Sequence, residues 1–284
     1  MPVLTHNLGG ADVIGANDLL QRRTVEPGTS VRLHLVNTDN GPRRFVLAGA
    51  SYRVAAIDGV DLNAPALIRG QALELGGGGR YDVTFTMPRT PVRLQVAGSR
   101  VGIVFSADGR GSISAPEPEV LFDPTTYGQA KATSFGPRSR FDRRFQMTIT
   151  RKPGFLDGRP GLQWAVNGKI YPRTPMFMIR EGDLVKVSIS NRTGAFHPMH
   201  LHGHQMLVLS RNGRPVRGSP WWVDTLNVRP NERYETAFRA DNPGLWMDHC
   251  HNLRHAAKGL TMHVAYEGIT TPFQAGDDAR NHPE

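Results

Sequence analysis

Cysteine is almost absent from this chain, since Cys250 is the only one among 284 residues. One thiol cannot form an intrachain disulfide, so a disulfide scaffold is excluded, and so is a zinc site built on several thiolates. Long apolar runs are also missing, because none approaches the roughly 18 residues that a membrane-spanning helix needs, and we expect no membrane span. Hydrophobic residues make up 39% of the chain and charged residues 21%, which excludes a disordered chain.

Acidic residues are outnumbered, with 25 Asp and Glu against 34 Lys and Arg and a net charge of +9. Such an excess favours anionic partners, nucleic acid among them. The basic residues are scattered, however, and the densest group, residues 138–144, falls in an expected linker. Since no basic face carries interleaved aromatic residues, we expect a solvated basic surface and no nucleic-acid partner.

Turn-forming residues, by contrast, are abundant. The 31 glycines and 21 prolines make up nearly a fifth of the chain, against a usual share of about 12%. This composition favours many short strands and turns over helical bundles. The alternation of apolar and polar residues over 31–35 and over 185–189 predicts two half-buried strands.

These two strands belong to an internal repeat. Six residues within 25–37 match residues within 179–191 at an offset of 154, and Arg-Tyr-acid triplets at 80–82 and 233–235 match at an offset of 153. A single loop deletion explains the one-residue difference. We therefore predict an all-β chain of two homologous β-sandwich or Greek-key barrel domains, at 1–110 and 141–270. A linker at 111–140 and a loose tail at 271–284 complete the expected organisation.

The histidines are concentrated in the second expected domain. Six of the 11, with the only cysteine, fall in the segments H-P-M-H-L-H at 197–202 and H-C-H-N-L-R-H at 249–255. A lone buried histidine is most often a core residue, but six around one thiol favour a metal site. Successive side chains of a strand point to opposite faces, so the segments divide into two ligand sets. The first set is His197, Cys250 and His255, and the second is His200, His202, His249 and His251.

The chemistry of the two sets points to copper. Two imidazoles and one thiolate suit a trigonal blue-copper electron-transfer site. Zinc is an alternative for these residues, although a structural zinc site would lack its fourth ligand. The second, all-imidazole set suits further copper. Because His249 and His251 adjoin Cys250 covalently, the backbone offers electrons a path between the two sets.

Because of these two histidine motifs, the chain resembles the second and third cupredoxin domains of the three-domain multicopper oxidases, the laccase-like family. The resemblance covers most of residues 20–268. The resemblance implies tandem cupredoxin-like domains, with type 1 copper on the first ligand set. It implies type 2 copper on His200 and type 3 copper on His202, His249 and His251. The family's axial position falls on Leu260, which cannot coordinate, so a three-coordinate type 1 site with a raised potential is implied. Met262 is the alternative axial ligand.

Half of the family's trinuclear copper cluster has no ligands in this chain. The family takes the remaining histidines from H-x-H-G and H-x-H motifs of its first domain, and no such pair occurs outside the second expected domain. The repeat aligns the histidines of 197–202 and the residues 249–251 with non-ligands: Arg43, Val46, Ala48, Val96, Ala97 and Gly98. This also argues against a two-domain oxidase or a copper nitrite reductase. We therefore expect a further domain or chain to supply the missing ligands.

Three functions remain open at this point. The first is a copper oxidase that takes single electrons from phenols or metal ions and reduces dioxygen to water. The second is a type 1 copper electron carrier or an oxidase remnant without dioxygen chemistry, and the third is a structural protein with a vestigial metal site. The resemblance favours a periplasmic or secreted location, although residues 1–6 lack the charged and apolar regions of a secretory signal.

Several residues near the motifs receive other interpretations. We expect His204 to hydrogen-bond locally, His263 to be structural, and Met176 and Met178 to lie in the core. The Trp-Trp-Val-Asp segment at 221–224 either borders the donor site or supplies a core or interface aromatic pair. Arg254 and Ala256 flank His255 where family members often carry a carboxylate, so protons must come from elsewhere.

Overall fold

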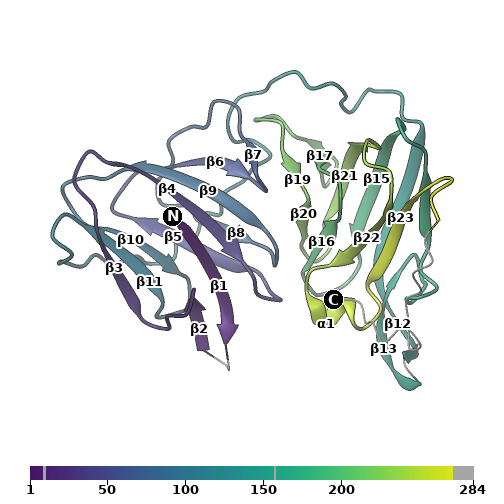
Figure 1. Ribbon diagram of the computed structural model, residues 1–284, viewed down its shortest axis with the longest axis horizontal. Helices are drawn as coiled ribbons and strands as arrows, with labels where there is room; N and C mark the ends of the chain where they lie inside the picture. The colour runs from purple at the N-terminus through teal and green to yellow at the C-terminus, as the bar shows by residue number, and fades with distance from the viewer. Residues whose placement is uncertain (9–10, 157, 271–284) are drawn as a thin grey trace. The chain divides into compact units, whose positions relative to one another are not determined.

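A computed structural model describes residues 1–8, 11–156 and 158–270. The chain forms two compact units: residues 1–131 with 217–219, and residues 132–216 with 220–284. Almost all of their regular secondary structure is β-strand (Figure 1), which confirms the predicted all-β class. No helix within the described ranges is long and apolar enough to cross a membrane. The expected tail at 271–284 lies outside the described residues.

The first unit consists of two sheets. The strands of the six-stranded sheet are β1 (Pro2–Leu8), β2 (Ala11–Ile14), β4 (Ser30–Asn37), β6 (Arg53–Ile57), β7 (Val60–Asp61) and β9 (Arg80–Thr86). The strands of the five-stranded sheet are β3 (Leu20–Thr24), β5 (Arg43–Ala48), β8 (Ala72–Leu75), β10 (Val92–Val96) and β11 (Gly102–Ser106). Their orders are β2-β1-β4-β9-β6-β7 and β3-β11-β10-β5-β8. Alternate side chains of these strands are buried, as in Leu33 and Leu35 of β4.

The second unit repeats this arrangement. The strands of its larger sheet are β12 (Arg143–Leu156), β13 (Arg159–Val166), β15 (Leu184–Asn191), β17 (Met206–Arg211), β18 (Arg214–Pro215), β19 (Trp222–Val223) and β21 (Arg233–Arg239). The strands of its smaller sheet are β14 (Met176–Ile179), β16 (His197–Leu201), β20 (Thr225–Val228), β22 (Leu245–Cys250) and β23 (Thr261–Tyr266). A short helix, α1 (Leu253–Ala256), follows β22. The smaller sheet has the order β14-β23-β22-β16-β20, which is the order of its counterpart in the first unit.

Equivalent hydrogen bonds support the internal repeat. The buried amide of Asn37 donates to the carbonyl oxygens of Gly41 and Leu75 at 2.8 and 2.9 Å. Asn191, 154 residues later, donates in the same way to the carbonyls of Ala195 and Val228 at 2.7 and 3.1 Å. A buried amide at the end of a strand must be satisfied. In each unit this asparagine therefore ties the strand end to the loop that follows it.

Strand register corrects the alignment of the two units by one residue. Phe45 pairs with Val96 in the first unit, and Met199 pairs with Cys250 in the second. The backbone N–H groups of Ala97 and His251 donate to the equivalent carbonyls of Arg44 and Pro198. Residues 249–251 therefore correspond to 95–97, not to 96–98, because a second one-residue change in loop length, after β9 and β21, restores the offset of 154. The counterpart of Cys250 is Val96, which cannot bind a metal.

The segment at 111–140 differs from the predicted surface linker. It contains no strand beyond an isolated bridge, yet Phe122 and Tyr127 are buried in the first unit and pack edge to face at 4.8 Å between ring centroids. Phe135 is buried in the second unit against Leu207 and Leu209. The prediction weighed the prolines and the basic residues and overlooked these aromatic side chains, whose burial favours an ordered path.

Candidate metal centre

The two histidine segments lie on neighbouring strands of the smaller sheet of the second unit. In the register of β16 and β22, Met199 pairs with Cys250 and His200 pairs with His249. Residues that pair directly share a face of the sheet. Cys250 and His197 therefore face the interior, where both are fully buried, while His200 and His249 lie on the other face.

His197, Cys250 and His255 form the first cluster, and their ligand atoms all lie within 4.8 Å of one another. Cys250 Sγ is 3.7 Å from Nδ1 of His197 and 3.7 Å from Nδ1 of His255, and the two Nδ1 atoms are 3.2 Å apart. His255 reaches this point from α1, where the side chain of Asn252 accepts a hydrogen bond from its backbone N–H. Three soft or borderline donors thus converge on one small volume.

A buried hydroxyl fixes the orientation of His197. The Thr193 hydroxyl donates to Asn191 Oδ1 at 2.7 Å, so its oxygen accepts the hydrogen bond from Nε2–H of His197 at 2.9 Å. Nδ1 of His197 is then the unprotonated nitrogen, and its lone pair faces Cys250. Metal-ligating histidines are commonly held by such a partner on the other ring nitrogen.

Replacing Thr193 with valine should weaken metal binding at this cluster. Valine has a similar shape but no hydroxyl, so His197 loses the group that fixes its tautomer. We expect about a 10–100-fold lower copper affinity, measured by competition with a chelator. Thr193→Ser keeps the hydroxyl and serves as the control. Equal affinities for the valine and serine variants would contradict this role.

Burial sets the protonation of the cluster. It lowers the pKa of His197 to about 3, with a further contribution from His255, and that of His255 to about 4, with contributions from Arg151 and Lys258. Burial also raises the pKa of the Cys250 thiol well above its usual range. Both imidazoles are therefore neutral near pH 7, and their Nδ1 atoms lie 3.2 Å apart. A metal cation can bind neutral imidazoles and stabilises the thiolate, so the donor set fits a bound metal ion.

The candidate axial residues are both buried in the same unit. Leu260 and Met262 are fully buried, and the Leu260 carbonyl accepts the hydrogen bond from the Cys250 backbone N–H at 3.1 Å. The Leu260 side chain carries no donor atom. The three-coordinate site and the alternative of Met262 therefore stay predictions.

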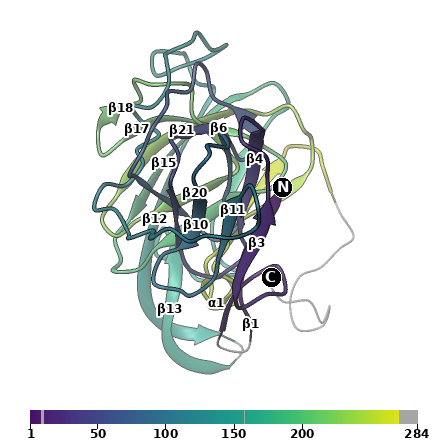
Figure 2. The same ribbon diagram turned by 90° about the vertical axis from the view of Figure 1, so that its left-hand side faces the viewer.

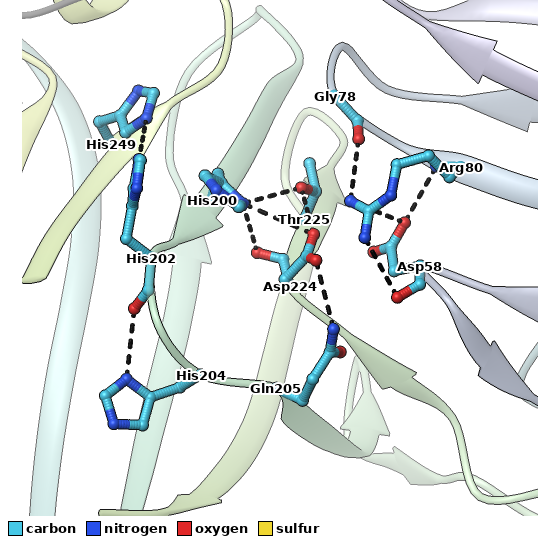
Figure 3. Close-up of polar contacts among 10 residues, drawn as sticks. All are labelled: Asp58, Gly78, Arg80, His200, His202, His204, Gln205, Asp224, Thr225 and His249. Carbon is cyan, nitrogen blue, oxygen red and sulfur yellow. Dashed lines mark hydrogen bonds and ion pairs between the residues drawn. The ribbon is translucent and has the colours of Figure 1, made fainter. Parts of the chain in front are cut away.

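The second cluster gathers four imidazoles on the other face. His202 Nε2 is 3.0 Å from His249 Nε2, and the ring of His200 lies 4.5 Å from that of His202 and 5.9 Å from that of His251, between centroids. Figure 3 shows His200 held by its neighbours: its Nδ1 is 3.1 Å from the Asp224 carbonyl oxygen and 3.0 Å from the Thr225 hydroxyl. Hydrogen bonding at Nδ1 leaves Nε2 of His200 as the nitrogen for a ligand.

Two carboxyl groups near this cluster were not foreseen from the sequence. Asp224 lies 3.5 Å from His200 Nδ1, accepts a hydrogen bond from Gln205, and raises the pKa of His200 against the effect of burial. Asp248 is buried beside His249, and desolvation raises the pKa of its carboxyl group to about 7. The position of Asp248 directly before the H-C-H motif is the sequence feature from which this carboxyl group could have been predicted. Acidic groups are therefore present near the second cluster although none flanks His255.

The remaining sequence interpretations have mixed outcomes. His204 hydrogen-bonds to the His202 carbonyl and to the Tyr266 hydroxyl, as expected, and Trp221 is buried as a core aromatic. The core assignment of Met176 and Met178 is wrong, because they are 50% and 42% exposed. They lie on β14, an edge strand of which Phe177 and Ile179 face the interior.

A glycine within the histidine segment provides a stability prediction. Gly203 has φ +74°, and an added Cβ would lie 2.5 Å from the Trp246 ring, whereas Gly213 has φ +77° and open space around it. Gly213→Ala should cost about 1–2 kcal/mol from backbone strain alone. Gly203→Ala should cost a further ~1–3 kcal/mol from overpacking. Denaturant unfolding measures both free energies, and equal losses would refute the steric contact.

Comparison with known proteins identifies the second unit. Residues 137–268 match the family model described as multicopper oxidase. The second unit is a multicopper oxidase domain. The chain is 27% identical over 253 residues to the multicopper oxidase MmcO of Mycobacterium tuberculosis, an alignment that covers 85% of this chain and 47% of that protein. It is 32% identical over 144 residues to the iron transport multicopper oxidase FET3 of Saccharomyces cerevisiae, covering 44% of this chain and 23% of that protein.

Solved multicopper oxidases share the fold of both units. The structure of Fet3p, described as functioning in iron import, superimposes with a TM-score of 0.72 at 16% identity, over 94% of this chain and 65% of that one. A laccase from Pediococcus acidilactici gives 0.70 at 19% identity, over 93% and 59%. The chain thus spans about half the length of MmcO and under two thirds of the laccase. The cupredoxin-like fold predicted for the two domains is confirmed.

Proposed function

We propose that the chain is part of a copper-dependent oxidase that removes single electrons from small donors and passes them to dioxygen. One observation carries this proposal: Cys250 lies in the first cluster, while His249 and His251, its covalent neighbours, lie in the second. A peptide of three residues therefore connects a His₂Cys site with an all-imidazole site. A structural metal site needs no such connection.

The residues of the two clusters would bind different copper ions. His197, Cys250 and His255 would hold type 1 copper, His200 type 2 copper, and His202, His249 and His251 type 3 copper. Copper at the first cluster supplies a one-electron acceptor. Thr193 holds His197 in the ligating tautomer, and burial of Cys250 keeps water from the thiolate. Asp224 and Thr225 orient His200, and the protein environment thereby positions the groups around the metal.

The reaction balances over four donor molecules. Each phenol gives up one electron and one proton, and four of each convert one dioxygen to two waters. Metal ions are the alternative donors, and several relatives are named as iron transport oxidases. Asp248, with a pKa near 7, and Asp224 are the acidic groups placed to exchange protons beside the second cluster.

Completion of the second cluster requires ligands from elsewhere. In the described residues of the first unit, the strand positions equivalent to the ligands hold Arg43, Val46, Ala48, Gln95, Val96 and Ala97. We expect another domain or chain to donate histidines, and the oxidase to act in a periplasmic or secreted location. The same observation supports the second candidate, an electron carrier that uses the first cluster alone.

Anaerobic reduction tests the first cluster. The copper-loaded chain should show the intense absorption of a copper–thiolate bond, and one equivalent of electrons from hydroquinone should bleach it. Copper that binds without this absorption, or absorption that hydroquinone leaves unchanged, would support the vestigial site instead. Oxygen uptake, considered below, separates the oxidase from the electron carrier.

A further inference from the structure

The first cluster reaches the surface through His255. His197 and Cys250 are fully buried, whereas His255 is partly exposed. Trp164 of β13 packs on both histidines, with ring centroids 4.7 Å from His197 and 4.4 Å from His255. Because Trp164 is itself buried, a donor can approach the cluster only at the exposed edge of His255 and its immediate neighbours.

Two cations act on His255 at this edge, and a third, Arg254, adjoins it in the sequence. The Arg151 guanidinium lies 4.7 Å from the centre of the Trp164 ring and donates to the Leu162 carbonyl at 3.2 Å. The Trp164 backbone N–H donates to the Lys258 backbone carbonyl at 2.9 Å, and Lys258 acts electrostatically on His255. Arg254 directly precedes His255 in α1. All three basic side chains are exposed.

None of these three basic residues is paired with an acid of the described ranges. Ion pairs occur elsewhere in the second unit, as at Arg143 and Arg180, but none involves Arg151, Arg254 or Lys258 among the residues that the structure describes. Arg151 and Lys258 act electrostatically on His255, whose pKa they lower together with burial. The field at the exposed edge of the cluster is therefore positive.

Apolar side chains complete this surface. Leu162 is 47% exposed, and its carbonyl accepts the hydrogen bond from Arg151. Leu253 is 44% exposed and directly precedes Arg254 in the sequence. In Figures 1 and 2 the outer end of the β12–β13 hairpin extends on the side of the unit where α1 lies. We call Arg151, Leu162, Leu253, Arg254 and Lys258, grouped around His255, the His255 surface.

We infer that the His255 surface binds anionic aromatic electron donors, such as phenols that carry a carboxylate or a sulfonate, in preference to free metal cations. This inference rests on the proposed function and narrows its substrate class. Apolar contact with the leucines suits an aromatic ring, and the three cations suit its charged group. A positive field raises the encounter rate of anions about 10- to 1,000-fold at low salt and opposes the approach of Fe²⁺. The effect should fade as ionic strength shortens the Debye length.

Binding to the metal-free chain tests this inference without turnover. The probes are 4-methoxybenzenesulfonate, which is anionic and not a phenol, and neutral anisole, followed by NMR shifts of the Trp164 indole. We expect the sulfonate to bind at least about 10-fold more tightly than anisole at low salt. Arg151→Gln combined with Lys258→Gln should remove this preference, whereas Arg214→Gln on β18 should retain it. Equal binding of both probes, or a preference unchanged in the double variant, would overturn the inference.

A second experiment separates this inference from the proposed function. The rate at which donors bleach the absorption of the copper-loaded chain is compared for hydroquinone sulfonate, neutral hydroquinone and Fe²⁺ at low and high salt. The sulfonate should react fastest at low salt and lose its advantage at high salt. If all donors bleach the absorption but Fe²⁺ is fastest at low salt, the inferred charge preference is wrong, while the copper site remains supported. If none bleaches it, the proposed function fails.

Discussion

Replacing Cys250 with serine should abolish the copper–thiolate absorption of the chain completely. Cys250 is the only thiol in the sequence and the only sulfur in the first cluster. Serine is nearly the same size, but its hydroxyl does not form the thiolate bond on which the intense absorption depends. The measurement is visible absorption of the copper-loaded variant, together with the rise in melting temperature that copper produces by binding the folded state. Both should disappear.

The control for Cys250→Ser is His263→Gln on β23. His263 is half-buried and outside both clusters. It should therefore keep both the absorption and the stabilisation by copper. Circular dichroism checks that the serine variant is folded, since a polar group buried without a partner costs about 1–3 kcal/mol. A folded serine variant that stays blue would refute the role of Cys250.

The copper-loaded chain by itself should not consume dioxygen catalytically. Its second cluster has four imidazoles, and the equivalent positions of the first unit hold no ligands. We expect phenol to reduce the first cluster once, without the sustained turnover that a complete oxidase shows. An oxygen electrode measures the uptake, and free copper at the same concentration sets the background.

Adding the missing ligands should change this result. A longer chain, or a second polypeptide that carries H-x-H-G and H-x-H motifs, should restore sustained oxygen uptake, and His202→Ala should suppress the restored uptake while the absorption of the first cluster stays. Sustained turnover by a verified monomer of the chain would contradict the requirement for further ligands. Failure of every such addition would favour the electron carrier.

Much of the fold was predictable because the side chains of a β-strand point to alternate faces, with a period of two residues. The alternation over 31–35 and 185–189 located β4 and β15, and the repeat anticipated two homologous β-domains. The same period divided the histidines between the two faces of one sheet. The register between paired strands could not be predicted in this way, because a change in loop length does not alter the alternation within either strand. The alignment of Cys250 was therefore wrong by one residue.

Contacts between distant segments accounted for the other differences. Asp224 and Thr225 reach His200 only because β20 pairs with β16, and no short motif joins them. Trp164 covers the first cluster from a hairpin that the sequence did not connect with it. Met176 and Met178 alternate as core residues do, but alternation alone does not tell which face of an edge strand is buried.

X-ray absorption at the copper edge tests most directly whether His197, Cys250 and His255 bind copper together. The chain loaded with one equivalent of copper should show one short copper–sulfur path and two copper–nitrogen paths, and the sulfur path should vanish in Cys250→Ser. A copper site with only nitrogen and oxygen neighbours in the unmodified chain would contradict the proposed centre.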